Sequence, residues 1–289
     1  MQWLNNDRAL TANLKPEVIF WDCDGVLANN SEALAMPIAG IILNEAMKAL
    51  HPGAPQFDID TFTTKYAGGH FSQFYKLAED MLKGFDASLQ LLPEAELDLL
   101  KVSRTVEVLS EKARPAADLS PMLRNMHALG FKQLVVSSSE LNRVLPCVEK
   151  IVGYDFGGSW SPMGTGRVIS AADTIAMIFG ERRVKPMPDV AGFSAMAAGI
   201  YAERSIKGLA IEDSASGAQC WKNDGIPFIG YVGGEHILDK DTHAKMLLEK
   251  GALAVFDNFK EMNAYVTSLK NAPSATQDFK ATTLKANPV

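Results

Sequence analysis

Two aspartates, Asp22 and Asp24, lie two residues apart directly after the apolar run VIFW at 18–21. Successive strand residues alternate between two faces, so the two carboxylates point roughly the same way if the strand geometry continues. Close like charges repel, and burial adds the loss of hydration. A hard dication such as Mg2+ would relieve this repulsion, because it prefers oxygen ligands. The pair therefore indicates either a cation site or two solvated carboxylates at the tight turn that Gly25 predicts.

Three further polar groups follow other apolar runs, and ligands of open α/β sheets bind at the carboxyl ends of strands. The serines at 137–139 offer hydroxyl and N–H groups that can hold phosphate oxygens. Lys185 lies among prolines that fix the backbone, and Glu212 and Asp213 are adjacent carboxylates. Each group also has a plainer interpretation: a polar capping loop, a solvated lysine in a turn, or a charged helix start. Two aspartates spaced in this way also occur in metal-dependent glycosyltransferases, so the ordered set is more informative than any single motif.

The elements that must position these residues are short apolar strands separated by helices. Strands are predicted at 18–21, 133–139, 208–214, 227–232 and 253–257, and helices at 119–130, 189–200 and 216–225. Strands without polar alternation, separated by helices, indicate a parallel sheet covered on both faces. The predicted fold class is α/β, with a Rossmann-like, doubly wound parallel sheet.

Residues 31–113 differ, because they show helical periodicity and no convincing strand. We interpret this stretch as an inserted all-helical cap domain of ordinary small-domain size. The predicted bounds are 1–27 and 114–270 for the discontinuous sheet domain and 28–113 for the cap. The polar segment 271–289 is predicted to be a flexible tail. The Gly-rich segment 152–168 leaves open whether Trp160 and Met163 line an entrance or pack against the body.

Composition excludes several classes of protein. The chain has 289 residues, of which 47% are hydrophobic and 21% charged, and its net charge of −6 disfavours a broad nucleic-acid surface. No apolar stretch approaches the ~20 residues that a membrane span needs, and no signal peptide is recognisable. Three distant cysteines without a paired spacing suit a reducing compartment, so we expect a cytoplasmic protein. The five histidines show no metal-binding spacing, and the sequence leaves a monomer and a dimer open.

The ordered set DCDGV, SSS, KPMPD and EDSASG resembles the motifs of the haloacid dehalogenase superfamily of aspartate-nucleophile hydrolases, over roughly residues 16–270. The resemblance is closest to the subgroup with a helical cap inserted after the first aspartate motif, which includes phosphoglycolate phosphatases and beta-phosphoglucomutase. It implies that Asp22 attacks phosphorus to give an aspartyl-phosphate, and that Asp24 acts as general acid and then as general base.

The same resemblance implies a Mg2+ cofactor and a phosphate site. Its implied metal ligands are Asp22, the backbone carbonyl of Asp24, and Asp213, with Glu212 close by. Its implied phosphate-binding residues are Ser137, Ser138 and Lys185, of which Ser137 and Lys185 are also implied in catalysis. The cap would act as a lid that excludes bulk water, with hinges at the crossings 27–30 and 114–118.

The resemblance favours phosphoryl transfer among the reactions of this superfamily. True dehalogenases lack an acid at the position of Asp24, and the phosphonatase branch has a small residue there. The expected function is hydrolysis of a small phosphorylated metabolite such as a sugar phosphate. A phosphosugar mutase and a non-enzymatic protein that binds phosphorylated ligands are the alternatives.

Cap residues that face the site should select the leaving group. The segment 66–77 resembles the cap segment of the subgroup, in which related mutases carry an arginine shortly after a glycine. Here His70, Phe71, Ser72 and Gln73 occupy these positions, which disfavours mutase activity. His70 and Gln73 are possible substrate contacts, or surface residues at a helix start.

Overall fold

The computed structural model describes residues 2–4, 14–65, 71–199 and 207–271. Within these residues, seven strands form one sheet in the order β1-β7-β6-β5-β2-β3-β4, and only β1 and β7 pair in antiparallel orientation. The strands are β1 (Gln2–Leu4), β2 (Val18–Trp21), β3 (Lys132–Ser137), β4 (Val168–Ser170), β5 (Gly208–Glu212), β6 (Phe228–Tyr231) and β7 (Ala254–Phe256). The strand that precedes the two aspartates, β2, therefore lies inside the sheet.

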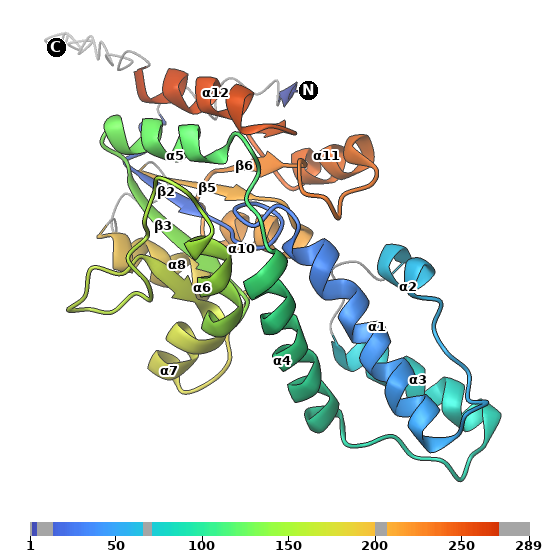
Figure 1. The fold of residues 1–289 in the computed structure, drawn as a ribbon. Helices are drawn as coiled ribbons and strands as arrows, with labels where there is room; N and C mark the ends of the chain where they lie inside the picture. The colour runs from blue at the N-terminus through green and yellow to red at the C-terminus, as the bar shows by residue number, and fades with distance from the viewer. Residues whose placement is uncertain (1, 5–13, 66–70, 200–206, 272–289) are drawn as a thin grey trace, which may run out of the picture.

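Helices cover both faces of the sheet (Figure 1). The helices on one face are α5 (Leu119–Ala128), α6 (Leu141–Glu149) and α12 (Phe259–Asn271), and those on the other are α8 (Pro188–Ala198), α10 (Ala215–Asn223) and α11 (Lys240–Glu249). Ile19 and Trp21 of β2 belong to the first apolar cluster, and Val18 and Phe20 belong to the second. Burial on both faces explains why this strand is a continuous apolar run. The α/β, doubly wound sheet that the sequence predicts is confirmed.

A separate helical unit follows β2 and stands to one side of the sheet (Figure 1). Its helices are α1 (Ser31–Leu50), α2 (Ile59–Lys65), α3 (Phe71–Phe85) and α4 (Glu94–Lys112). They enclose their own apolar cluster, in which Leu43, Phe62 and Phe74 are buried. The all-helical insertion is therefore present, whereas the exact domain bounds stay a prediction.

Helix α1 is the one described helix that is long and apolar enough to cross a membrane by length and composition. The core helix of a globular protein passes the same test, and here Ile38, Ile42 and Leu43 of α1 are buried in the helical cluster. The sequence prediction that no apolar stretch approaches the length of a membrane span is therefore wrong for residues 31–50 by length and composition, because single charged residues such as Glu45 leave the helix apolar overall.

The two chain crossings between the sheet and the helical unit lie side by side. The Asn29 N–H donates to the Arg114 carbonyl at 2.9 Å. The Asn30 side chain donates to the Lys112 carbonyl at 2.9 Å and accepts from the Arg114 N–H at 2.9 Å. A hinge role for these crossings stays a prediction.

Several features differ from the sequence prediction. Strands β1 and β4 were not predicted, because each has three residues and a pattern cannot be recognised over so short a stretch. A π-helix, η2 (Ala171–Ile175), leads into the short helix α7 (Ala176–Phe179) and was not predicted either. Of the two residues left open in the Gly-rich segment, Trp160 packs against Phe193 of α8, with 5.2 Å between the ring centroids. Met163 is 98% exposed. Neither side chain lines the cavity described below.

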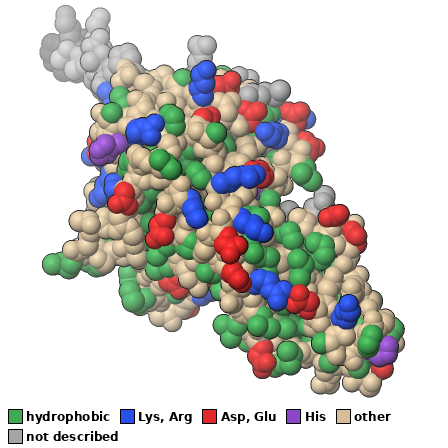
Figure 2. All heavy atoms as spheres, in the orientation of Figure 1, with side chains coloured by type: hydrophobic (Ala, Val, Ile, Leu, Met, Phe, Trp, Pro, Cys, Tyr) green, Lys and Arg blue, Asp and Glu red, His purple; other side chains and the backbone are tan. Residues whose placement is uncertain are grey.

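On the face shown in Figure 2, the described acidic and basic side chains are interspersed, without a broad basic area. The predicted tail 271–289 lies outside the described residues, apart from Asn271 at the end of α12.

Candidate active site

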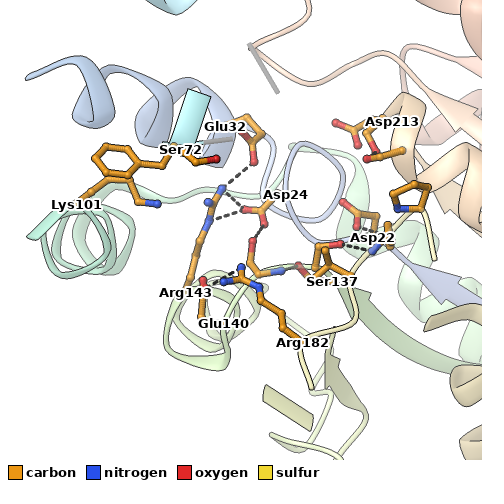
Figure 3. Close-up of a pocket in the computed structure, with 18 of the residues that line it drawn as sticks. Asp22, Asp24, Glu32, Ser72, Lys101, Ser137, Glu140, Arg143, Arg182 and Asp213 are labelled. Carbon is orange, nitrogen blue, oxygen red and sulfur yellow. Dashed lines mark hydrogen bonds and ion pairs between the residues drawn. The ribbon is translucent and has the colours of Figure 1, made fainter. Parts of the chain in front are cut away.

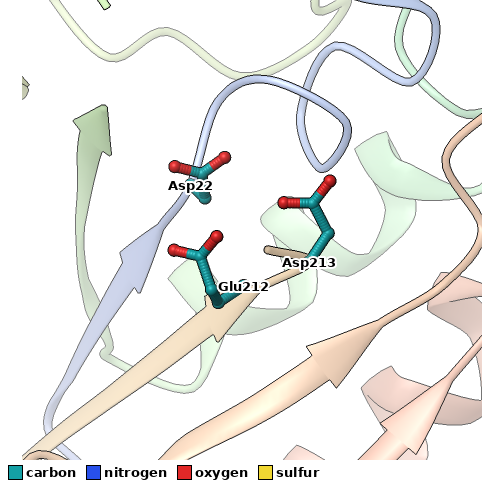
Figure 4. Close-up of side chains that lie close together, drawn as sticks. All are labelled: Asp22, Glu212 and Asp213. Atoms are coloured by element: carbon teal, nitrogen blue, oxygen red, sulfur yellow. The ribbon is translucent and has the colours of Figure 1, made fainter. Parts of the chain in front are cut away.

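The carboxyl ends of β2 and β5 bring three acidic side chains together (Figure 4). The two strands pair in parallel with Trp21 opposite Ile211, and the Asp22 N–H donates to the Ile211 carbonyl at 3.0 Å. Asp22, Glu212 and Asp213 are all buried, and one oxygen of each lies within 4.8 Å of the other two. The register of two neighbouring strands thus assembles three of the four residues that the sequence implies at a metal site.

Lys185 lies against this acidic group. Its Nζ is 2.5 Å from Asp22 Oδ1 and 2.7 Å from Glu212 Oε2, and its side chain is 3% exposed. The same nitrogen lies 5.6 Å from the ring centroid of Trp221, whose indole N–H donates to Glu212 Oε2 at 3.2 Å. Burial opposes the charge of Lys185, but the two carboxylates outweigh burial and raise its pKa above the usual value. Lys185 is therefore a fixed positive charge beside Asp22.

The acidic group still carries more negative charge than Lys185 offsets. Burial, followed by the charge of Glu212, raises the pKa of Asp22 well above its usual value despite Lys185. Burial and Glu212 also raise the pKa of Asp213. Burial alone would raise the pKa of Glu212 as well, but Lys185 outweighs burial and lowers it. Buried carboxylates with hard oxygen donors and excess negative charge fit a divalent cation such as Mg2+.

The turn after Asp24 lies directly against Asp213. Gly25 has a φ of +79°, and a Cβ built on it would lie 2.1 Å from Asp213 Oδ2 and 2.6 Å from His236 Cε1. His236 Nε2 is 3.2 Å from the same carboxylate oxygen, and His243 Nε2 is 2.5 Å from the Asp213 carbonyl oxygen. Burial lowers the pKa of both histidines. Two residues to which the sequence gives no role therefore hold Asp213 in place.

The Asp24 carboxylate has different partners from Asp22. Ser139 Oγ donates to its Oδ2 at 2.7 Å, and Arg143 donates to its Oδ1 from Nε at 3.2 Å and from Nη2 at 3.0 Å. Burial raises the pKa of Asp24, but the charge of Arg143 and hydrogen bonds from Ser139, Ser31 and Arg143 outweigh burial and lower it. Arg143 Nη2 also donates to Glu32 Oε1 at 2.7 Å. One guanidinium thus connects α6 to both the aspartate loop and the first turn of α1.

The serine loop after β3 supports Lys185 and Asp24. Ser137 Oγ accepts from the Ser139 N–H at 3.0 Å, and Ser138 Oγ accepts from the Lys185 N–H at 3.1 Å. All three serines line the cavity described next. The loop therefore borders the same cavity as Asp22 and Lys185, and its phosphate-binding role stays a prediction.

A cavity of about 510 Å³ lies between the sheet edge and the helical unit (Figure 3). Its lining from the helical unit consists of Glu32, Phe71, Ser72, Glu94, Asp98 and Lys101, and the sheet side contributes Asp22, Asp24, Ser137, Ser138, Lys185 and Asp213. Lys101 lies 2.6 Å from Asp98 and sits over the Phe71 ring at 5.0 Å. The volume suits a small-molecule ligand.

The two predicted cap contacts have different outcomes. Gln73 is exposed on α3 and does not line the cavity, whereas its neighbour Ser72 does. His70 lies outside the described residues.

Sequence reasoning missed two charged residues that bind each other in the site, Arg143 and Glu32, and it missed the contact of Ser139 with Asp24. Ser139 and Arg143 are four residues apart, and Glu32 lies in the first turn of the helix that follows the aspartate motif. The signal that could have found them is their closeness to predicted motifs, because helix starts at strand ends face the same sheet edge.

No family model matches the chain, and no curated protein matches it. Several solved structures are similar to it. A conserved haloacid dehalogenase-like protein of unknown function from Agrobacterium tumefaciens is 23% identical, with a TM-score of 0.64 and coverage of 88% of this chain and 99% of that chain. A haloacid dehalogenase (HAD) family hydrolase from Deinococcus radiodurans, with bound phosphate and sodium, is 20% identical, with a TM-score of 0.61 and coverage of 89% and 97%.

The beta-phosphoglucomutase from Clostridium difficile is 16% identical, with a TM-score of 0.55 and coverage of 89% of this chain and 97% of that chain. These similarities extend over both the sheet and the helical unit. The chain therefore has the fold of the haloacid dehalogenase-like proteins.

Proposed function

We propose that the protein is a Mg2+-dependent phosphatase that hydrolyses a small phosphorylated metabolite through an aspartyl-phosphate on Asp22. The observation that supports this most is the position of Asp22, which lines the cavity and lies beside a buried ammonium and two further carboxylates. A carboxylate in such a place is suited to attack phosphorus. The bound phosphate of the Deinococcus radiodurans neighbour supports a phosphate site in this fold.

In the first step, an Asp22 oxygen attacks the phosphorus of the phosphomonoester. The bond between phosphorus and the leaving oxygen breaks as the Asp22–phosphorus bond forms, and its electron pair goes to the leaving oxygen. Asp24 first leaves one of its contacts with Arg143 and Ser139, which favour its ionised form, and takes up a proton from solvent. It then gives this proton to the leaving oxygen, so a neutral alcohol leaves. Lys185 and the serine loop at 137–139 hold the phosphoryl oxygens.

In the second step, water attacks the phosphorus of the aspartyl-phosphate. The Asp24 carboxylate takes a proton from this water as the oxygen–phosphorus bond forms. The Asp22–phosphorus bond breaks, which frees the Asp22 carboxylate and inorganic phosphate. Asp24 is again protonated, and the net change is one phosphomonoester and one water to one alcohol and one phosphate.

Asp22, Asp213 and the backbone carbonyl of Asp24 would hold the cation, since all three offer hard oxygen atoms. When bound, Mg2+ supplies positive charge that offsets the negative charge of the phosphoryl group during transfer.

Glu212 is suited to a different task. Its Oε2 accepts from Lys185 and Trp221, and its Oε1 accepts from the Ser214 N–H at 3.1 Å and hydroxyl at 2.8 Å. Both oxygens are thus occupied by protein donors, so we assign Glu212 to positioning Lys185.

The lining of the cavity favours a leaving group without a second anionic group. Every Lys or Arg among the described lining residues has a carboxylate partner: Lys101 with Asp98, Arg143 with Asp24 and Glu32, Arg182 with Glu140, and Lys185 with Asp22 and Glu212. A second phosphate would meet further acidic groups such as Glu94 instead of an unpaired cation. A phosphatase acting on an uncharged or cationic phosphomonoester is therefore favoured over a phosphosugar mutase, which handles a bisphosphate.

The test of the proposed function is Mg2+-dependent hydrolysis of p-nitrophenyl phosphate. Asp22→Asn should lower kcat by at least about 1,000-fold. The matched control is Asp86→Asn, an exposed position of the helical unit, which should leave kcat unchanged. Equal rates for wild type and Asp22→Asn would exclude the nucleophile.

Two further outcomes separate the alternatives. Conversion of glucose 1-phosphate to glucose 6-phosphate, without phosphate release, would identify a mutase. Phosphate binding without any turnover would identify a non-enzymatic protein that binds phosphorylated ligands. A cytoplasmic location and a monomeric or dimeric state stay predictions.

A further inference from the structure

Arg143 connects α6 to two carboxylates, Asp24 and Glu32, that lie 119 and 111 residues before it in the sequence (Figure 3). It belongs to α6, and its guanidinium donates to Asp24 in the aspartate loop and to Glu32 at the start of α1. Its side chain is 19% exposed and lines the cavity. No role follows for it from the predicted motifs.

The geometry requires an arginine in particular. Nε and Nη2 both reach Asp24 Oδ1, while Nη2 also reaches Glu32 Oε1 at 2.7 Å. A planar guanidinium can present several donors in a fixed arrangement, whereas a lysine ammonium is a single point charge. Without the guanidinium, two partly buried carboxylates would face each other unpaired, which is unfavourable.

We propose that Arg143 is a positioning residue that holds the Asp24 side chain. Because Arg143 also contacts Glu32, the position of the Asp24 side chain depends on where α1 lies. This inference rests on the proposed function, in which Asp24 moves protons. Asp24 contacts the leaving oxygen, whereas Arg143 acts through Asp24.

To act on a leaving oxygen, the Asp24 carboxylate has to leave one of its present partners. Both of its oxygens are occupied, Oδ2 by Ser139 and Oδ1 by Arg143. One of these contacts must open before Asp24 reaches a leaving oxygen. Glu32 remains as an acceptor for Arg143 when this happens, so the guanidinium stays paired while Asp24 turns. Glu32 lies just after the crossing at 27–30, so a movement of the helical unit about this crossing changes the geometry of the Arg143 contacts.

The test compares kcat/KM on two substrates, because this constant covers the steps up to release of the leaving group. Glycerol 1-phosphate has an alcohol leaving group that needs a proton, whereas p-nitrophenolate leaves without one. Arg143→Gln should lower kcat/KM on glycerol 1-phosphate by about 100-fold and on p-nitrophenyl phosphate by about 3-fold or less. Glu32→Gln should show the same selectivity with a smaller loss of about 5-fold, since Asp24 keeps its own contact with Arg143.

Arg104 provides a matched control, because it joins α4 to Glu45 of α1 through an exposed ion pair of 2.9 Å away from the cavity. Arg104→Gln should leave both substrates unaffected. Arg143→Lys keeps the charge and should recover only part of the loss on glycerol 1-phosphate. If Arg143→Gln does not fold, Arg143→Lys and Glu32→Gln carry the same comparison.

Equal losses on the two substrates, or full recovery in Arg143→Lys, would overturn the inference, because a merely structural charge would act in that way. Rates in Arg143→Gln and Glu32→Gln that match Arg104→Gln would overturn it too. These results leave the proposed function intact as long as Asp22→Asn is inactive. An active Asp22→Asn would instead overturn the proposed function.

Discussion

Replacing Lys185 by methionine would remove the ammonium that contacts both Asp22 and Glu212. The side chain is 3% exposed, so water cannot replace the lost contacts. Removing one partner of a buried ion pair costs about 3–5 kcal/mol, because the remaining charge is left without a counter-ion. Methionine has a similar volume and length, so lost packing adds little. We expect the free energy of unfolding to fall by about 3–5 kcal/mol near neutral pH in metal-free protein.

The pH dependence of this loss identifies its cause. Lys185 holds the pKa of Glu212 below its usual value of 4.5, so this stabilisation is present above about pH 4.5 and is lost as the pH falls through the lowered value. The raised pKa of Lys185 adds stability that persists throughout this range. In Lys185→Met the carboxylates take up protons more readily as the solution is acidified. The difference between wild type and variant is therefore largest near neutral pH. It begins to shrink above pH 4.5, where the unpaired carboxylates of the variant take up protons, and it shrinks further as wild type loses the Glu212 contribution.

Urea unfolding followed by circular dichroism, with a chelator present, measures this difference at each pH. The matched control is Lys101→Met, whose partner Asp98 is 40% exposed, and the expected loss there is below about 1 kcal/mol. A loss in Lys185→Met that is independent of pH would refute the electrostatic reasoning and indicate lost packing instead.

Three further outcomes are expected. In metal-free protein, the raised pKa values of Asp22 and Asp213 contribute stability below their usual value of 3.8, and this stability is lost as the pH rises through the raised values. Because Mg2+ binds the ionised carboxylates, it should increase Tm more near pH 7.5 than near pH 5. Calorimetry measures this, and an equal gain in Asp213→Asn would contradict it. Gly25→Ala should lower the free energy of unfolding by about 1–2 kcal/mol because of its left-handed φ, and it should abolish the Mg2+ effect on Tm by displacing Asp213. The control Gly84→Ala, at a position with open space around it, should keep the Mg2+ effect. An unchanged Mg2+ effect in Gly25→Ala would contradict this prediction. Because acidic residues line the cavity, kcat/KM should be about 10-fold lower for the anionic phosphoglycolate than for the cationic ethanolamine phosphate. Glu94→Gln should reduce this difference in kcat/KM. A preference for phosphoglycolate would show that the charge of the cavity does not select the substrate.

The sheet and the acidic group could be predicted because local patterns determine them. The central strands are buried on both faces, so they are continuous apolar runs in the sequence. Parallel strands end at the same edge, so carboxylates after β2 and β5 were expected to meet, and the pairing of Trp21 with Ile211 places them side by side. The helical character of residues 31–113 could be recognised from periodicity alone, and α1 begins this stretch at Ser31.

The contacts across the cavity could not be predicted from the sequence. Arg143 and Glu32 are 111 residues apart, and their contact depends on where the helical unit stands relative to α6. His236 and His243 reach Asp213 from the region after β6, and their spacing carries no recognisable pattern. At the start of α3, the Ser72 side chain points into the cavity and that of Gln73 does not. A sequence prediction that misplaces the start of this helix by one residue selects the wrong one of the two.

The helical unit has an apolar interior of its own, and only its ends, at Leu34 of α1 and Leu109 of α4, join the cluster on one face of the sheet. Residues on its inner surface, such as Phe71 and Lys101, can therefore change identity without disturbing the interior on which the sheet depends. Substitutions in this unit can therefore change the helical side of the cavity while the carboxylates at the edge of the sheet stay the same. If the proposed phosphatase activity holds, chimaeras that exchange the helical unit between proteins of this fold should keep phosphate release and change the preferred substrate.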